Sequence, residues 1–142
     1  MKSIIGTIIL ATSLALCSFG VAAQERDEKV VYHINDSANA RAALANVRNH
    51  LDASPKARII VVTHGPGIDF LLEGAKDAKG NGYDASVADL VNRKVDFRVC
   101  NNTLIARNID KSKVIQEASI VPSGVAEIAR LQAKEGYVYI KP

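Results

Sequence analysis

The chain has 142 residues and a formal net charge of +3, from 18 Lys plus Arg against 15 Asp plus Glu. Charges of both signs are scattered along the sequence, which argues against a surface built to bind nucleic acid. The length is that of one ordinary domain and does not require a second. We therefore expect a single domain with no nucleic-acid partner.

The first 23 residues have the composition of a secretory signal peptide. Lys2 supplies a positive charge, residues 4–15 are almost wholly apolar, and Val21-Ala22-Ala23 offers small residues for cleavage before Gln24. A membrane anchor is the weaker reading because the apolar run is short and interrupted. A lipoprotein signal at Cys17 is also weaker, because a large leucine precedes it. We predict cleavage and no stable membrane insertion afterwards.

Cleavage at this point would release a periplasmic or secreted domain spanning residues 24–142, about 119 residues long. Export places a protein where structural disulfides are common. Cys100 would be the one cysteine left in the domain, so it cannot form a disulfide within the chain. It is then a buried packing residue, a functional thiol or a link between chains.

Short segments rich in β-branched and aromatic residues alternate with segments whose apolar residues recur at helical spacing. Strands are predicted, in chain order, at 29–34, 58–63, 95–100, 119–121 and 137–140. Helices are predicted between them at 40–51, 68–75, 87–91, 104–109 and 125–131. Because parallel strands need crossovers that usually contain a helix, this order predicts a three-layer α/β/α domain with a mainly parallel sheet.

Polar residues follow three of the predicted strands, in the segments Asn35-Asp36, Thr63-His64-Gly65-Pro66-Gly67 and Cys100-Asn101-Asn102-Thr103. In open α/β sheets the ligand crevice lies beyond the carboxyl ends of the strands, so we expect these segments to lie close together. The candidate catalytic residues are Cys100 and His64. The candidate binding residues are Asn35, Gly65, Gly67, Asn101, Asn102 and Thr103.

Cys100 is expected to be the reactive group of this site. Thr103 or Asn102 can cap the helix that follows, and the partial positive charge of a helix N-terminus favours the thiolate. His64 is predicted to accept a proton or to orient the thiol, as a Cys/His pair requires. The alternative for Cys100 is a small buried hydrophobe at a strand end, which is common for free cysteine.

Other groups of residues in the sequence are weaker evidence for a functional site. His33 lies within the first predicted strand, where a packed or hydrogen-bonded core histidine is favoured over a ligand. A metal site from His33, His64 and Cys100 is conceivable, but the sequence has no paired-ligand spacing. The segment Gly65-Pro66-Gly67 is shorter than a dinucleotide or phosphate-loop motif and is explained by a tight turn. We expect neither a metal nor a cofactor.

Three short motifs together resemble one known family. Thr-His-Gly-Pro-Gly-Ile at 63–68, Val-Cys-Asn-Asn-Thr-Leu at 99–104 and Val-Pro-Ser-Gly-Val-Ala-Glu-Ile-Ala-Arg-Leu-Gln at 121–132 occur in the right order. The chain is similar to the DsrE/DsrF-like, or YchN-like, superfamily, and in particular to its small exported members. The resemblance implies a flavodoxin-like sandwich of about five strands that assembles as a homotrimer or hexamer.

The resemblance also implies a chemistry. Cys100 aligns with the cysteine that carries sulfur as a persulfide in the active members, so a sulfur carrier or sulfurtransferase with protein sulfur donors and acceptors is expected. Two other classes fit the same residues. One is a non-catalytic domain that binds a small ligand or supports assembly, and the other is a thiol redox sensor.

Overall fold

The computed structural model describes residues 27–142, so the predicted signal peptide and its cleavage site lie outside the described residues. No helix in this part of the chain is long and apolar enough to cross a membrane. Its strands are β1 (Lys29–Ile34), β2 (Arg58–Thr63), β3 (Asp96–Cys100), β4 (Ala118–Val121) and β5 (Val138–Ile140). Its α-helices are α1 (Ala40–Ala53), α2 (Asp84–Asn92), α3 (Asn101–Ala106) and α4 (Gly124–Glu135), and its 3₁₀ helices are η1 (Ser37–Asn39), η2 (Gly65–Leu71) and η3 (Lys111–Lys113).

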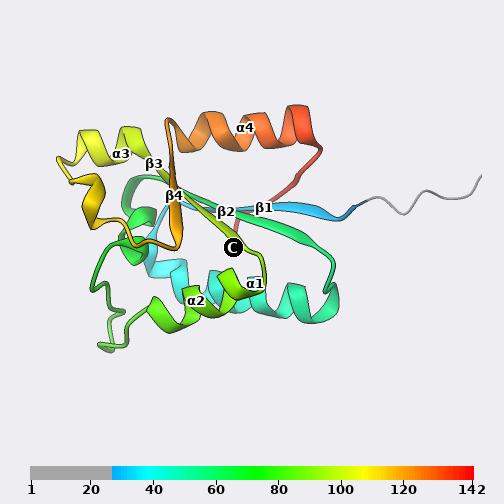
Figure 1. Cartoon of the computed structure of the whole chain (residues 1–142), viewed down its shortest axis with the longest axis horizontal. Coiled ribbons are helices and arrows are strands. Elements are labelled where there is room, and N and C mark those ends of the chain that lie inside the picture. The colour runs from blue at the N-terminus through cyan, green and yellow to red at the C-terminus, as the bar shows by residue number, and fades with distance from the viewer. Residues whose placement is uncertain (1–26) are drawn as a thin grey trace, which may run out of the picture.

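The five strands form one parallel sheet in the order β4-β3-β2-β1-β5. The chain steps in one direction from β1 to β4 and then returns across the whole sheet to β5. Because such crossovers are right-handed, α4 in the return connection lies on the face opposite α1 and α2. Figure 1 shows α1 and α2 on one side of the sheet and α4 on the other. The expected three-layer fold is confirmed.

The two faces of the sheet are packed very differently. Alternation along β1 directs Val30, Tyr32 and Ile34 toward a large apolar core shared with α1 and α2, while Val31 faces α4. The largest fully buried side chains, including Phe70 and Phe97, belong to the α1/α2 side. The α4 side has a small apolar cluster made of Val31, Ile60, Val62, Ile128 and Leu131.

Ion pairs supplement this small cluster. Arg98 of β3 pairs with Asp96 at 2.6 Å and with Glu127 of α4, and Arg130 donates to Glu127 at 2.7 Å. The Glu127 side chain is 11% exposed. Hydrogen bonds from Arg130 and Arg98 hold the pKa of Glu127 below its usual value, although burial opposes them. A charged network therefore attaches α4 to the sheet where apolar contact is limited.

Two helices differ from the sequence-based prediction. The helix expected at 68–75 is the 3₁₀ helix η2, which ends at Leu71 because Leu72 is extended and bridges Val114. Gly65 at φ +55° and Pro66 near the start of η2 favour this tight turn. The helix expected at 104–109 is α3, which begins three residues earlier.

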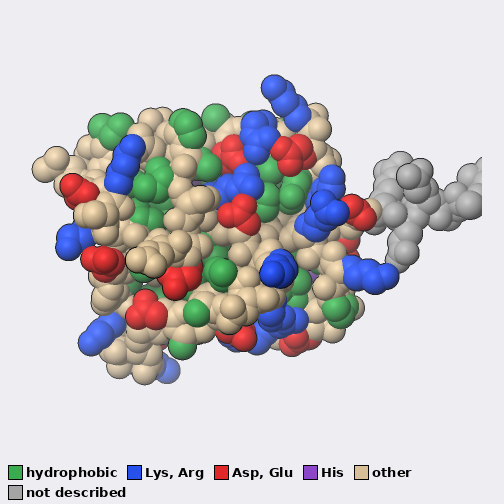
Figure 2. Space-filling model, viewed as in Figure 1, with side chains coloured by type: hydrophobic (Ala, Val, Ile, Leu, Met, Phe, Trp, Pro, Cys, Tyr) green, Lys and Arg blue, Asp and Glu red, His purple; other side chains and the backbone are tan. Residues whose placement is uncertain are grey.

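The outer surface carries mixed charge. On the face drawn in Figure 2, Lys and Arg side chains alternate with Asp and Glu, and apolar side chains lie between them. Several basic residues on the described surface are paired, as Arg58 is with Asp27 at 3.1 Å and Arg93 with Asp52 at 2.8 Å. Much of the positive charge is therefore neutralised locally.

Candidate functional site

Cys100 lies at the junction between a strand and a helix. It is the last residue of β3 and the N-cap residue of α3, at the carboxyl edge of the sheet. Only 4% of the residue is exposed, yet it belongs to neither apolar cluster. The thiol is thus buried among backbone and polar groups, which is unusual for a cysteine that only fills apolar space.

Hydrogen bonds to the sulfur favour the thiolate. Burial raises the pKa of Cys100, but the Gly124 N–H, the Thr103 hydroxyl and the N–H groups of Thr103 and Asn102 together lower it below the ordinary value. Hydrogen bonding to the charged form is one of the ways in which proteins stabilise an anion. The site can therefore hold negative charge on sulfur without a neighbouring cation.

Thr103 acts differently from the prediction. Neither Thr103 nor Asn102 caps α3, because both lie inside its first turn and Cys100 occupies the N-cap position. Thr103 Oγ1 instead accepts a hydrogen bond from the Gly65 N–H at 2.9 Å. Its own proton is then free for the sulfur. Gly65 is therefore connected to the site by its hydrogen bond to Thr103.

Gly124, the first residue of α4, covers the site on the face of the sheet opposite α1 and α2. A Cβ at this position would lie 3.1 Å from the Thr63 carbonyl oxygen, 3.2 Å from Cys100 Cβ and 3.3 Å from His64 Cβ. The absence of a side chain allows the Gly124 N–H to approach the sulfur. Sequence reasoning placed Gly124 only at a helix start, and its position within the third family-like motif was the available signal.

His64 lies next to the Cys100 site but bonds to another histidine. Its Nε2 is 2.6 Å from Nε2 of His33, and His33 Nδ1 is 2.7 Å from the Tyr139 hydroxyl. Burial and, second, Lys141 lower the pKa of His64. The expectation that His33 is a hydrogen-bonded histidine agrees with this geometry. The sequence did not predict the hydrogen bond between His33 and His64, because this bond depends on the pairing of β1 with β2.

Two predicted binding residues lie apart from the thiol. Strand β2 separates β1 from β3, so Asn35, which follows β1, is not adjacent to Cys100. A Cβ on Gly67 would lie 2.1 Å from the Ile34 carbonyl oxygen and 2.7 Å from Asn35 Cα. Gly67 is therefore required for close packing of η2 against the end of β1. The three strand ends nevertheless meet through the turn at 65–67, where the Ser37 hydroxyl donates to the Pro66 carbonyl and a Cβ on Gly65 would lie 3.8 Å from the Asn35 carbonyl oxygen. Asn35 itself lies one strand further from Cys100 than His64 does.

Asn101 carries an unusual acceptor. Its Oδ1 is buried and has no hydrogen-bond partner among the described residues. Buried polar atoms are usually paired, so an unpaired one next to a candidate reactive group calls for an explanation. A donor on a bound ligand or on a neighbouring subunit would satisfy it. The backbone N–H of Asn102 donates to the Pro122 carbonyl at 3.2 Å and so divides its hydrogen bonding between that oxygen and the Cys100 sulfur.

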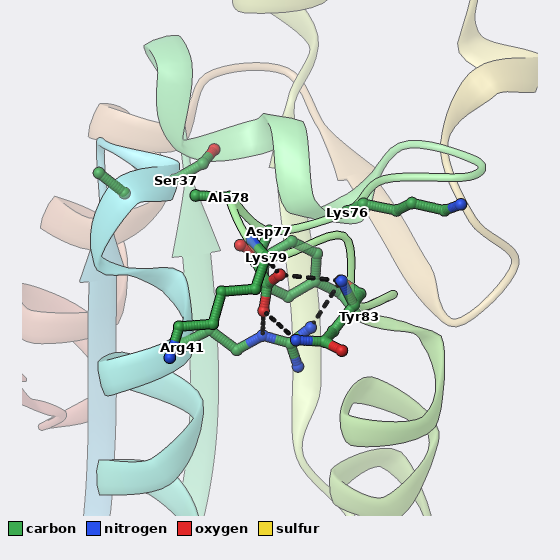
Figure 3. Close-up of a pocket in the computed structure, with 9 residues that line it drawn as sticks. Ser37, Arg41, Lys76, Asp77, Ala78, Lys79 and Tyr83 are labelled. Atoms are coloured by element: carbon green, nitrogen blue, oxygen red, sulfur yellow. Dashed lines mark hydrogen bonds and ion pairs between the residues drawn. The ribbon is translucent and has the colours of Figure 1, made fainter.

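A separate open hollow of about 790 Å³ lies beside the N-terminal end of α1. Figure 3 shows the Arg41 guanidinium joined to the loop that carries Asp77. Arg41 also donates to the carbonyls of Asn81 and Gly82 and lies over the Tyr83 ring at 4.2 Å. Its donors are thus used to hold the loop, so the hollow lacks a free arginine for an anionic ligand.

The fold and this cysteine site define a class. Residues 24–142 match the DsrE/DsrF-like family, and the chain belongs to that family. The structure is similar to that of MTH1491 from Methanobacterium thermoautotrophicum, a protein described as of unknown function. The two share 32% identity at a TM-score of 0.73, over 82% of this chain and 100% of the other.

A second solved structure shares the fold. The ychN protein from E. coli is 14% identical to this chain, with a TM-score of 0.67 over 81% of this chain and 99% of the other. A comparison with curated proteins found no match. The recognition of the family from the three motifs is confirmed, and so is the fold.

Proposed function

We propose that this protein carries sulfane sulfur as a persulfide on Cys100. The observation that supports the proposal most strongly is the place of the buried thiol, at the N-cap position of α3 and directly against Gly124, where Gly124, Thr103 and Asn102 lower its pKa. The thiolate is the nucleophile in sulfur transfer, and the same donors would stabilise a persulfide anion.

The chemistry requires no metal and no external oxidant. The Cys100 thiolate attacks the outer sulfur of a donor persulfide and forms a new S–S bond while the S–S bond of the donor breaks. The donor leaves as a thiolate and takes a proton. A thiol of an acceptor then attacks the outer sulfur on Cys100, which restores the starting thiolate. The donor and acceptor would be thiol-bearing proteins or small molecules.

Mass spectrometry tests the proposal. The purified protein in a Cys17→Ser background, where Cys100 is the only cysteine, is incubated with a persulfide donor. We expect mass to increase in steps of one sulfur atom, to be removed by a reductant, and to be absent in the matched Cys100→Ser protein. An unmodified Cys100 across several persulfide donors would overturn the proposal.

One observation favours a second candidate. Because Cys100 is only 4% exposed, a donor must reach it through local opening or through a narrow approach. A non-catalytic binding or assembly domain, in which the cysteine only bonds to α3 and α4, would need no such access. That candidate predicts no sulfur loading and an unchanged assembly in Cys100→Ser. A redox sensor instead predicts an oxidant-dependent disulfide or sulfenate at Cys100.

Export and self-association are part of the proposal. Export rests on the composition of residues 1–23 and is tested by sequencing the N-terminus of the protein recovered from the producing cell. Assembly as a trimer or hexamer is supported by apolar side chains on the described surface, namely Ile105, Val125, Val138 and Tyr139. Light scattering that shows only monomers at micromolar concentration would contradict assembly.

A further inference from the structure

A row of three hydrogen-bonding side chains ends beside the Cys100 site. The Tyr139 hydroxyl on the edge strand β5 is 2.7 Å from His33 Nδ1, and His33 Nε2 is 2.6 Å from His64 Nε2. The three residues come from adjacent strands or strand ends, because β1 lies between β5 and β2. We refer to Tyr139, His33 and His64 as the histidine chain.

The two imidazoles meet through nitrogen atoms. Their centroids are 4.6 Å apart with ring planes inclined by 28°, while the Nε2 atoms of His33 and His64 are only 2.6 Å apart. The nitrogen separation is shorter than the centroid separation by roughly one ring width, so the rings meet edge to edge. A nitrogen pair at this distance must share one proton, because two N–H groups would repel and two bare nitrogens would not bond.

Both rings are neutral at neutral pH. Burial first, and then His64 and Lys141, lower the pKa of His33 to about 4, and the pKa of His64 is lowered as well. Groups facing the chain come from several elements: Lys141 after β5, Cys100 at the end of β3, uncharged Gly124 of α4, and Asp36 and Pro142 around a small hollow beside His33. A neutral imidazole has one N–H, so each ring has two possible tautomers.

We infer that Tyr139 and His33 are positioning residues that keep the proton of His64 on Nδ1, so that a sulfur group held on Cys100 meets His64 as a neutral hydrogen-bond donor. The Cβ atoms of Cys100 and His64 lie 3.2 Å and 3.3 Å from one shared point, the place that a Cβ on Gly124 would take. A phenol is the better donor and an imidazole nitrogen the better acceptor, so Tyr139 donates to His33 Nδ1. His33 must then carry its proton on Nε2 and donate it to His64 Nε2. The one N–H of His64 is thereby left on Nδ1.

This inference rests on the proposed role of Cys100 and changes the role of His64. A neutral N–H stabilises a thiolate or persulfide anion, whereas a base would have to take up a proton in a site that disfavours the charged ring. The proton of the thiol therefore leaves to solvent or to the departing donor thiolate, and His64 keeps its own. The tautomer of a histidine is set by the bond that its other nitrogen makes.

Nuclear magnetic resonance of the purified protein in the Cys17→Ser background tests the inference. Ring ¹⁵N shifts at neutral pH should show His64 protonated on Nδ1 and His33 protonated on Nε2. In Tyr139→Phe we expect His64 to become a mixture of tautomers. In the sulfur-loaded protein, the pKa of the Cys100 persulfide, followed by the Cβ shift of Cys100, should then rise by about half a unit to one unit, the size expected for one lost neutral hydrogen bond.

Matched variants separate positioning from structure. Tyr137→Phe removes the hydroxyl of a tyrosine two residues away in the sequence that is not in the histidine chain, and it should change neither measurement. His33→Gln keeps an amide that can donate to His64 Nε2 and should preserve the His64 tautomer, whereas His33→Leu should lose it. These readouts report tautomer and titration, which packing alone would not move in this pattern.

The outcomes are decisive. Protonation of His64 on Nε2 in the unmodified protein would overturn the inference, as would a titration of the Cys100 persulfide that is identical in Tyr139→Phe. Sulfur loading is measured separately by mass, so its failure would remove the proposed function while leaving the tautomer result intact. Normal loading with the wrong His64 tautomer would instead overturn only the role given to the histidine chain.

Discussion

The two faces of the sheet serve different purposes. The face toward α1 and α2 is filled by a continuous apolar core that includes Phe70 and Phe97. The face toward α4 has a small apolar cluster, an ion-pair network around Arg98, and the polar histidine chain. Apolar burial is the main source of stability in a small domain. The α1/α2 face therefore supplies most of the stability, and the α4 face can accommodate polar groups.

The contrast also explains where the site lies. Cys100 touches the α4 side through Gly124, at the point where apolar packing ends and hydrogen bonding begins. The apolar core on the α1/α2 side lowers the local polarity and so strengthens the hydrogen bonds to the sulfur. The donors of these bonds come from α3 and α4. Changes on the α1/α2 face should alter stability, and changes at this end of α4 should alter the titration of the thiol.

The largest expected effect is in the main core. Phe97→Ala removes a fully buried ring that packs edge-on against Phe70, and we expect it to lower the free energy of unfolding by about 3–5 kcal/mol. Ile128→Ala, in the small cluster, should cost about 2 kcal/mol. Urea denaturation measures both. Equal losses on the two faces would contradict the contrast between them.

Gly124→Ala tests the closure of the site. The new Cβ would meet the Thr63 carbonyl oxygen at 3.1 Å, and a backbone atom in a central strand cannot move aside cheaply. We expect a loss of about 1–3 kcal/mol and a higher pKa for Cys100, because α4 must withdraw its N–H. Gly82→Ala is the control, since its nearest contact would be a carboxylate oxygen at 3.7 Å.

Glu127→Gln tests the ion pairs that attach α4. Arg98 and Arg130 hold the pKa of Glu127 below its unfolded value, so its contribution is present above the unfolded pKa and is lost as pH falls through the folded one. We expect a loss of about 1–2 kcal/mol at pH 7 that disappears in acid. Unfolding curves across pH measure it. A loss that is the same at pH 7 and in acid would show that the charge is unimportant.

The smallest effect is expected at Thr103. Thr103→Val removes the hydroxyl that links the Gly65 N–H to the sulfur, and the pKa of Cys100 should rise by about half a unit with little change in stability. Thr103→Ser keeps the hydroxyl and should keep the pKa. The Cβ shift of Cys100 followed through a pH titration is the measurement. An unchanged pKa of Cys100 in Thr103→Val would show that the Thr103 hydroxyl does not donate to the sulfur.

Part of the site was predictable because it lies at chain positions that a parallel sheet brings together. Cys100 is the last residue of β3 and His64 follows β2, and these two strands are neighbours, so their ends meet. Asn35 contacts the turn at 65–67 but not Cys100, since β2 lies between β1 and β3 and strand order cannot be read from periodicity. The cap at Thr103 was misassigned, because the hydroxyl bonds to Gly65 in a different segment.

The amino-acid sequence alone determined the alternation of strands and helices, the family and the position of the thiol at a strand end. These depend on local hydrophobic periodicity, turn residues and short motifs, all of which are written within a few consecutive residues. Only the tertiary structure decided that Gly124 closes the site and that Tyr139, His33 and His64 form one hydrogen-bonded chain. Those contacts join residues distant along the chain, and they arise from strand order and from the return of α4 across the sheet.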